Sequence, residues 1–298
     1  MGLMAGAFNA ARSGAAATRS PVAALLASYS VEATARGVSE VSALRDGLPP
    51  GAEVFIANLP HDVPDETVAR AVELARAGLE PVPHIGVRYC ESAAALDGLI
   101  ARLAAEAGVH RILLIAGDID RPRGPFASTI DVLRLAPFAR HGIDTVGIGA
   151  YPEGHPRIDD ATLDAALRTK LDLLGAAGTF TFIVTQFCFE AVPIRRWIAA
   201  ARRRGVTAPI RIGLAGPASM ATLARYAHRC GIGASARALI ARPGTVSRLM
   251  RHPGPDSILR DLAADGGPDP LRGGSRIHLF SFGGAERTVA WARKAAGG

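Results

Sequence analysis

Short apolar runs alternate along the chain with longer amphipathic stretches. The runs are dense in β-branched and aliphatic residues, which is typical of strands buried on both faces of a parallel sheet. They predict eight strands, at 28–32, 54–58, 82–87, 111–116, 145–150, 179–185, 210–214 and 276–282. Between the runs, apolar residues recur at three- and four-residue spacing. This periodicity predicts helices at 65–77, 92–107, 128–140, 160–176, 192–204, 219–230 and 286–295.

Eight strand-then-helix units over about 250 residues are what a (β/α)8 barrel requires. The competing architecture is a doubly wound sheet, which would place Gly-x-Gly-x-x-Gly after its first strand. Here the first strand leads into Ala33-Thr34-Ala35-Arg36 instead. We therefore expect an α/β protein in which residues 25–298 form a single-domain TIM barrel.

Two segments fall outside this repeat. Residues 1–24 are rich in alanine and are expected to form a loosely ordered arm. Residues 231–274 are interpreted as an insertion before the last strand, with short helices at 245–250 and 257–264. We expect the insertion to pack outside the barrel or to carry an oligomer contact, which leaves a homo-oligomer open.

The composition narrows the classes of partner. The chain has 298 residues, a formal net charge of +7, and 34 basic residues, of which only Lys170 and Lys294 are lysines. Such a bias toward arginine, with abundant alanine and glycine, is more typical of skewed base composition in the coding sequence than of a polyanion-binding surface. Nucleic acid is therefore not expected as a partner.

The cysteine and hydropathy patterns indicate a cytoplasmic protein. Cys90, Cys188 and Cys230 are widely spaced and form no Cys-x-x-Cys pair, so neither a disulfide framework nor a zinc site is predicted. No stretch reaches the roughly 18 apolar residues of a membrane span. We expect a soluble protein without a metal ion, in a reducing cytoplasm and away from membranes.

Polar residues at the carboxyl ends of the strands are the candidates for chemistry, because barrel enzymes place their reactive groups there. The predicted strand ends supply Glu32, Asn58, Gly117 with Asp118, Tyr151 with His155, and Gln186, while His84 lies near the start of the third strand. Glu32 is either a general acid, with a pKa raised by a partly apolar site, or a rim carboxylate paired with Arg36. Asp118 either accepts a hydrogen bond from a ring N–H or belongs to an ordinary Gly-Asp turn.

Other candidates also have two interpretations. His84 is either a satisfied core residue or a functional one, and Lys170 is either a solvated helix residue or a point charge for a phosphate. The amide of Gln186 offers a donor and an acceptor to a planar heterocycle, with Phe187 and Phe189 as its apolar floor or simply as core. The arginines of 195–204 are interpreted as the outward face of a barrel helix rather than as a polyanion site.

Five motifs, taken in order, resemble the methylenetetrahydrofolate reductase family from about residue 28 to the C-terminus. Ser30-Val31-Glu32 is similar to the Ser-Phe-Glu of its first strand, Pro83-His84 to its third-strand histidine, and Gly117-Asp118 to its Arg-Gly-Asp. Residues 151–156, Tyr-Pro-Glu-Gly-His-Pro, resemble its Tyr-Pro-Glu-x-His-Pro, and residues 185–189, Thr-Gln-Phe-Cys-Phe, resemble its Thr-Gln-Phe-Phe-Phe. All five lie in register at strand ends.

The resemblance implies a flavin-dependent (β/α)8 oxidoreductase of one-carbon metabolism that reduces 5,10-methylenetetrahydrofolate to 5-methyltetrahydrofolate. NAD(P)H would reduce FAD, and the reduced flavin would pass hydride to the methylene carbon. Carried over by motif, Glu32 assists opening of the methylene bridge as an acid, Asp118 lies between flavin and folate, and Gln186 holds the pterin. The residues implied to line the FAD are Asn58, His84, Gly117, Ala127, Tyr151, His155 and Lys170.

The chain departs from the family pattern at positions that concern the flavin. Ala116 stands where the family has Arg before Gly-Asp, and Thr169-Lys170 replaces an Arg-Lys pair, so two cations expected near the FAD diphosphate are missing. The family's Tyr-Thr-Leu-Asn-Arg reads Phe-Ser-Phe-Gly-Gly at 280–284. These changes indicate a divergent member that binds flavin weakly or transfers hydride directly from NAD(P)H.

Two other functions stay open from the sequence. One is a non-catalytic folate-binding or one-carbon carrier protein that works with a demethylase. The other is an arginine-rich polyanion binder, whose affinity would fall steeply with salt.

Overall fold

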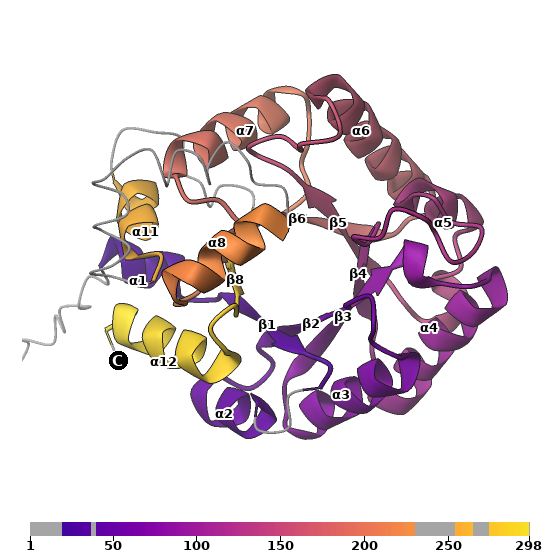
Figure 1. The fold of residues 1–298 in the computed structure, drawn as a ribbon, viewed down its shortest axis with the longest axis horizontal. Helices are drawn as coiled ribbons and strands as arrows, with labels where there is room; N and C mark the ends of the chain where they lie inside the picture. The colour runs from indigo at the N-terminus through magenta and orange to yellow at the C-terminus, as the bar shows by residue number, and fades with distance from the viewer. Residues whose placement is uncertain (1–19, 37–39, 230–253, 265–273, 298) are drawn as a thin grey trace, which may run out of the picture.

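The computed structural model describes residues 20–36, 40–229, 254–264 and 274–297. Within these residues, eight parallel strands close into a barrel in sequence order from β1 to β8 (Figure 1). The strands are β1 Ser30–Thr34, β2 Glu53–Ala57, β3 Glu80–Gly86, β4 Arg111–Ile115, β5 Thr145–Ala150, β6 Phe180–Thr185, β7 Ile210–Ala215 and β8 Arg276–Phe280. The single-domain α/β TIM barrel predicted from the sequence is confirmed.

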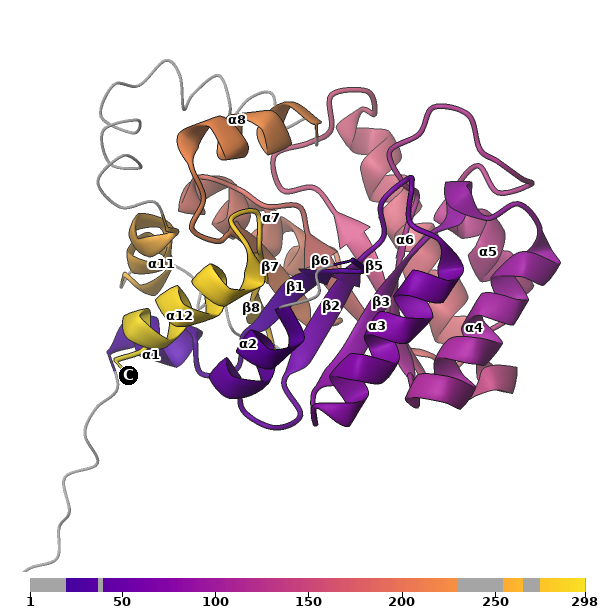
Figure 2. The ribbon, with the colours of Figure 1, turned by 60° about the horizontal axis from the view of Figure 1, so that its bottom comes forward.

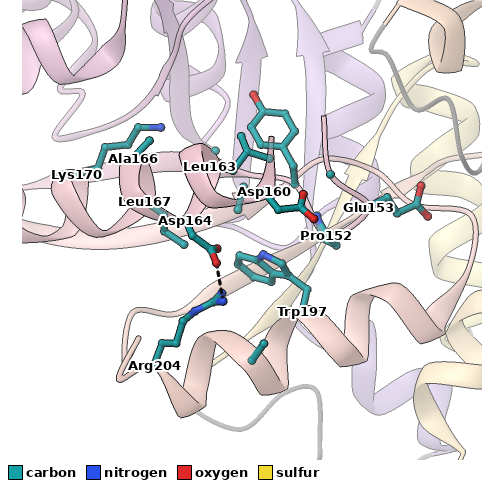
Figure 3. A pocket seen from close by; sticks show the side chains of 15 residues that line it. Pro152, Glu153, Asp160, Leu163, Asp164, Ala166, Leu167, Lys170, Trp197 and Arg204 are labelled. Carbon is teal, nitrogen blue, oxygen red and sulfur yellow. Dashed lines mark hydrogen bonds and ion pairs between the residues drawn. The ribbon is translucent and has the colours of Figure 1, made fainter. Parts of the chain in front are cut away.

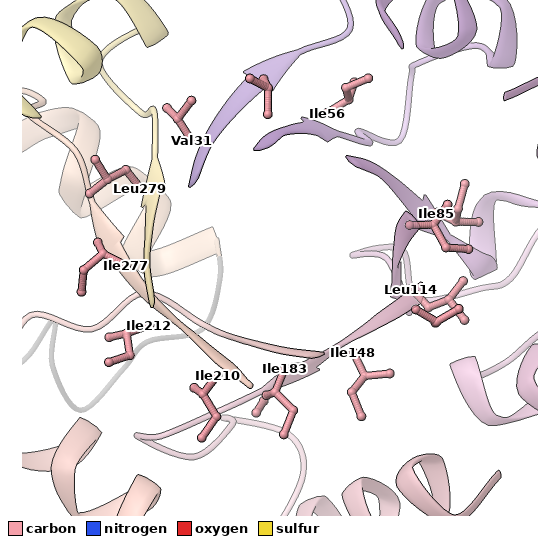
Figure 4. Packing of buried hydrophobic residues seen from close by; sticks show 14 of the residues in the cluster. Val31, Ile56, Ile85, Leu114, Ile148, Ile183, Ile210, Ile212, Ile277 and Leu279 are labelled. Carbon is pink, nitrogen blue, oxygen red and sulfur yellow. The ribbon is translucent and has the colours of Figure 1, made fainter. Parts of the chain in front are cut away.

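Alternate side chains along each strand point to opposite sides of the barrel wall. One set is aliphatic and packs outward against the helices, and Figure 4 shows Val31, Ile56, Ile85, Leu114, Ile148, Ile183, Ile210, Ile212, Ile277 and Leu279 in this layer. The other set fills the interior, where Phe55, Val82, Leu113, Phe182 and Val184 form one apolar cluster. The interior is therefore a packed core rather than a channel, and a polar group on its inner wall is desolvated.

Helices surround the strands on the outside of the barrel (Figure 1). They are α2 Glu40–Gly47, α3 Pro64–Arg76, α4 Ala93–Ala107, α5 Thr129–Leu135, α6 Asp160–Ala176, α7 Ala191–Arg203, α11 Asp256–Ala263 and α12 Ala285–Ala295. The last helix, α12, packs against α2, and β8 pairs with β1, so the ring closes between the two ends of the fold.

One helix lies away from this ring. The helix α8, Met220–Arg229, lies over the end of the barrel at which the strands terminate (Figures 1 and 2). Its residues Leu223 and Tyr226 pack with Phe187, Phe280 and other aromatic residues that follow β6 and β8. The amphipathic stretch predicted at 219–230 is confirmed as a helix, but it covers the β6–β8 side of the mouth rather than the outer wall.

Because α8 lies over the mouth, the helix that follows β7 does not cover the outer wall. Its place on the outside is taken by α11, which is the described part of the predicted insertion. The helix α11 contacts α7 and the short helix α1, Pro21–Leu25, and Asp256 of α11 accepts a hydrogen bond from Trp291 Nε1 of α12 at 3.2 Å. Arg195 of α7 donates from Nη2 to the carbonyls of Asp261 and Leu262 at 2.6 and 2.9 Å, which satisfies the C-terminal end of α11. The helix predicted at 257–264 is thus present, whereas the one predicted at 245–250 lies outside the described residues.

The N-terminal segment expected to be a loose arm ends in a helix. Ser20 caps α1 by accepting the N–H of Ala23 at 3.1 Å, and Leu25 of this helix belongs to the main hydrophobic core. Residues 1–19 lie outside the described residues.

Several predicted boundaries were wrong, each for a local reason. The helix predicted at 128–140 ends at Leu135, because Pro137 disfavours helical backbone at Ala136, which adopts φ 42°; a 3-10 turn, η2 Ala139–His141, follows. The helix α2 was not predicted, since its sequence is mostly polar and only Leu44 is buried. Strand β1 extends two residues beyond Glu32, and β3 begins four residues before His84.

No described helix combines the length and the apolar character needed to cross a membrane.

Candidate functional site

Three ionisable side chains meet inside the barrel near its mouth. Glu32 of β1, His84 of β3 and His278 of β8 all occupy inward-facing strand positions. The Oε1 atom of Glu32 lies 3.7 Å from His84 Nε2 and 3.6 Å from His278 Nε2. Ser30, the register partner of His278 across the β1–β8 seam, hydrogen-bonds to its Nδ1 at 2.9 Å. The two imidazoles therefore flank one carboxyl oxygen.

Burial decides the charge states of this cluster. The Glu32 side chain is 12% exposed, and its desolvation raises its pKa to about 7, opposed by the nearby His84. Desolvation also lowers the pKa of His84 to about 4 and that of His278 to about 3. Both histidines are thus neutral at pH 7, while Glu32 keeps its proton in a large share of molecules.

The rim interpretation of Glu32 is not what the structure shows. Arg36 instead donates from Nε to Glu66 at 2.8 Å and lies 3.6 Å from Asp62. Glu32 lies in the middle of β1 rather than at its end. Its side chain points into the barrel, where it lies beside His84 and His278. Its environment fits the general-acid interpretation, because a neutral carboxyl group near the mouth can donate a proton at physiological pH.

Aromatic rings separate this cluster from a second group of charges. Phe55 makes edge contacts with His84 and His278, at centroid distances of 5.8 and 4.6 Å. On its other side, the Arg211 guanidinium lies 5.6 Å from the Phe55 ring and binds Glu53 at 2.5 Å. Glu53 also binds Arg111. This ion network lies toward the start of the strands, away from the mouth, and is part of the scaffold.

A second group of predicted residues lies at the ends of β2, β3 and β4. Asn58 Oδ1 accepts the N–H of Gly86 at 2.9 Å. The ring of Tyr89, on the 3-10 turn η1 Val87–Tyr89, lies against Gly86 and Gly117. Its hydroxyl donates to the carboxylate of Asp118 and accepts the N–H of Asp118 at 3.0 Å. Asp118 is therefore held by Tyr89 rather than only by a Gly-Asp turn.

Ala127 joins this group through its backbone. Its carbonyl accepts a hydrogen bond from Arg88 Nε at 2.8 Å, and the N–H of Arg88 donates to the carbonyl of Ala116 at 3.0 Å. Arg88 thus ties the loop after β3 to the loop after β4. The chain contributes no side-chain polar group at position 127.

A third group lines a pocket of about 380 Å³ between β5, α6 and α7 (Figure 3). Tyr151 and Lys170 lie on its wall with Trp197 and with an ion pair between Arg204 and Asp164, at 2.7 Å. Burial lowers the pKa of Lys170, which forms no ion pair with any described residue. Glu153 and Asp160 also line this pocket, so its wall carries three carboxylates beside the cations of Lys170 and Arg204.

His155 follows the same loop. Its ring makes an edge contact with that of Tyr151 at 5.2 Å, and its Nδ1 accepts the N–H of Arg157 at 3.2 Å. Burial, with a smaller contribution from Arg157, lowers its pKa. His155 is therefore a neutral residue that supports Tyr151 at pH 7.

Gln186 begins the aromatic side of the mouth. Its side-chain Oε1 accepts the backbone N–H of Phe187 at 3.0 Å, and the backbone N–H of Gln186 donates to the carbonyl of Ala150 at 2.8 Å. Phe187 contacts Phe280 and Phe282, and Phe282 stacks on Tyr226 at 4.1 Å. Cys188 is buried and its desolvation raises the pKa of its thiol, in keeping with a small apolar residue.

The predicted residues thus fall into four groups: Glu32 with His84; Asn58, Gly117, Asp118 and Ala127; Tyr151, His155 and Lys170; and Gln186. Two residues beside these groups, His278 and Tyr89, were not predicted. His278 was detectable in principle, because a histidine that alternates with Ile277 and Leu279 must face the barrel interior. For Tyr89 no sequence signal existed, since its place depends on one glycine at the end of β3 and another in the loop after β4. No cluster of three or more potential metal ligands occurs among the described residues.

Comparison with known proteins gives a family and a fold. The family model of methylenetetrahydrofolate reductase matches residues 61–239. A solved structure from Clostridium thermocellum, described as an uncharacterized protein that binds two copies of 5-methyl-5,6,7,8-tetrahydrofolic acid, superposes with a TM-score of 0.57. It is 12% identical, over 90% of this chain and 94% of that chain. The catalytic domain of a mannanase from Streptomyces sp. SirexAA-E is more distant, with a TM-score of 0.40 and 16% identity over 65% of this chain and 68% of that chain.

The matched segment spans well over half of the 298 residues and carries four of the five motifs that were quoted from the sequence. The barrel fold and the position of these motifs at the carboxyl ends of the strands agree with it. The chain therefore belongs to the methylenetetrahydrofolate reductase family.

Proposed function

We propose that this protein reduces 5,10-methylenetetrahydrofolate to 5-methyltetrahydrofolate with hydride from NAD(P)H. The observation that carries the proposal is Glu32, a carboxyl group with a pKa of about 7 at the inner end of the barrel mouth. Family membership supplies the reaction class, and the folate bound by the Clostridium thermocellum protein supports a folate ligand.

The proposed chemistry needs one proton and one hydride. The bond between the methylene carbon and N10 of the folate breaks, and N10 takes a proton from Glu32. The methylene carbon, now part of an iminium ion on N5, accepts hydride and becomes a methyl group, while NAD(P)H becomes NAD(P)⁺. Glu32 is then reprotonated from solvent, which its 12% exposure permits.

Other residues of the mouth bind and orient the substrates in this proposal. His84 and His278 stay neutral at pH 7 and line the buried environment whose desolvation raises the pKa of Glu32. The amide of Gln186, beside the aromatic side chains under α8, is assigned to the pterin. Asp118, held by Tyr89, is assigned to the region between hydride donor and folate.

The residues implied to hold FAD do not fit a flavin well. Lys170 and Tyr151 line a pocket whose wall also carries the carboxylates of Glu153, Asp160 and Asp164. Alanine and threonine occupy positions 116 and 169, where cations were expected. The floor formed by Gly86 and Gly117 is covered by the ring of Tyr89. We therefore derive no step through a flavin.

Replacing Glu32 with glutamine tests the proposal. With methylenetetrahydrofolate and either NADH or NADPH, the wild type should form methyltetrahydrofolate, detected by mass spectrometry. Its kcat should fall about tenfold per pH unit above about pH 7, because only the protonated acid is active. In Glu32→Gln, kcat should drop by about 10²–10⁴-fold, this pH dependence should vanish, and folate affinity should remain.

A non-catalytic folate carrier is the second candidate, favoured by a structural neighbour that is described only as binding a methylated folate. In that case, neither the wild type nor Glu32→Gln would form product, and both would bind methyltetrahydrofolate equally. Absence of product from the wild type, with and without added FAD, would contradict the reductase proposal.

A further inference from the structure

The ring of Tyr89 lies against residues that the family resemblance assigns to the flavin site. A Cβ atom added at Gly86 would lie 2.4 Å from Cδ2 of Tyr89, and one added at Gly117 would lie 2.8 Å from its Cζ. The ring thus rests directly on the backbone of β3 and of the loop after β4. Only glycine leaves room for it at both positions, and Gly117 also has φ +91°.

The ring is fixed on several sides. Its hydroxyl both donates to the Asp118 carboxylate and accepts the N–H of Asp118. The guanidinium of Arg123 lies 5.7 Å from the ring centroid. Arg88, the preceding residue, is bound through its N–H to Ala116 and through its side chain to Ala127. Moving the ring away therefore breaks contacts that join two loops.

The position of the ring overlaps the predicted flavin neighbours. Gly117 and Asp118 contact it directly, and Asn58 Oδ1 lies beside it, within 3.0 Å of the Cβ position at Gly86. His84 and Gly86 are two residues apart in β3, so both face the interior, with Gly86 nearer the mouth. The ring of Tyr89 consequently lies on the mouth side of His84 and Glu32, among the residues that the family resemblance assigns to the flavin.

We propose that Tyr89 is a specificity-determining residue that excludes flavin from the mouth, so that hydride passes directly from C4 of the nicotinamide to the methylene carbon of the folate. This inference rests on the proposed reductase function. The balance needs no further redox partner: the folate gains one hydride and one proton, and NAD(P)H loses the hydride.

Flavin affinity gives the first test, with a readout that does not depend on turnover. FAD is titrated into the purified full-length protein and followed by its absorbance change and by equilibrium dialysis. The wild type and Tyr89→Phe, which keeps the ring, should retain no FAD. Tyr89→Ala, which opens the floor, should bind FAD at least about tenfold more tightly, or about 1.4 kcal/mol. Tyr226→Ala removes an aromatic ring on the other side of the mouth and serves as the control; it should leave FAD binding unchanged.

The origin of the transferred hydrogen gives the second test. The N5–H of a reduced flavin exchanges with solvent, so a flavin-mediated reaction in D2O places deuterium in the new methyl group. Direct transfer from NAD(P)H in D2O leaves that methyl group unlabelled, and C4-deuterated NAD(P)D in H2O labels it.

The outcomes separate the two proposals. A wild type that forms no methyl product contradicts the reductase function itself. A wild type that forms product but incorporates solvent deuterium, or that binds FAD as tightly as Tyr89→Ala, overturns the role of Tyr89. Failure of Tyr89→Ala to gain FAD affinity also overturns it, provided that its circular dichroism matches the wild type.

Discussion

The proton on Glu32 connects chemistry to stability at the scale of single residues. Burial disfavours its carboxylate, which favours the protonated acid and destabilises the folded state whenever the group ionises. The two neighbouring histidines affect the stability of the folded state at acid rather than alkaline pH, because folding lowers their pKa values. Their contribution to stability is present above pH 6.5, the ordinary histidine value, and is lost as the pH falls toward about 4 and about 3.

Glu32→Gln should therefore become the more stable protein at alkaline pH. The folded pKa of Glu32, about 7, exceeds the ordinary value of 4.5, so wild-type stability from this group is complete below 4.5 and lost as the pH rises through 7. The loss is about 3 kcal/mol. Urea unfolding at about pH 5 and about pH 8 measures the free energy of unfolding of both proteins. Between these pH values, the stability of the variant relative to the wild type should increase by up to this amount. An equal difference at both pH values would contradict the raised pKa, and Glu286→Gln, on the surface of α12, is the control.

At the scale of elements, a network of ion pairs links several strands at the end of the barrel where the strands begin. Glu53 of β2, 8% exposed, binds Arg211 of β7 and Arg111 of β4, so one carboxylate joins three strands. Arg111 also binds Glu80 of β3 at 2.7 Å. Removing one partner of a buried ion pair leaves an uncompensated charge in the interior.

Glu53→Gln should lower the free energy of unfolding by about 3–5 kcal/mol, because Arg211 would stay buried without its carboxylate. Urea titration measures the change. Glu106→Gln is the matched control, since Glu106 pairs with Arg102 on the surface of α4 and its loss should be undetectable. A wild-type midpoint in Glu53→Gln would show that the network contributes nothing.

Most elements were predictable because their burial pattern is local. The apolar runs of β5 and β6 could only be strands, and the periodicity of 160–176 matches α6 residue for residue. The position of the helix predicted at 219–230 could not be predicted, since the sequence pattern of an apolar helix face is the same whether the helix covers the outer wall or the barrel mouth. The site residues named from the motifs stay a prediction, whereas the places of His278 and Tyr89 depend on contacts between segments far apart in the sequence.

At the scale of the whole molecule, the described part of the segment between β7 and β8 is held at two places: α8 packs at the barrel mouth, and α11 packs on the outside. The helix α11 packs against α7 and α1 and bonds to α12, and Arg195 caps its C-terminal carbonyls. This attachment returns the chain to β8 and thereby allows the last strand to pair with the first.

Arg195→Ala should loosen α11 without unfolding the barrel. The lost charged hydrogen bonds are expected to destabilise this docking by about 1–3 kcal/mol. Hydrogen exchange followed by mass spectrometry should show faster exchange at 256–263 and no change in β2 to β5. Arg196→Ala, the exposed neighbour on the same helix, should exchange like the wild type; the same result for Arg195→Ala would contradict the anchoring role.

The pairing of Ser30 with His278 has a consequence for biosynthesis. The acid and one of its flanking imidazoles come from the first and last strands to be translated, at positions 32 and 278. A nascent chain therefore contains no assembled Glu32–His278 pair until β8 has been translated and has paired with β1. If the proposed function holds, a product truncated before β8 lacks one of the two imidazoles beside the acid.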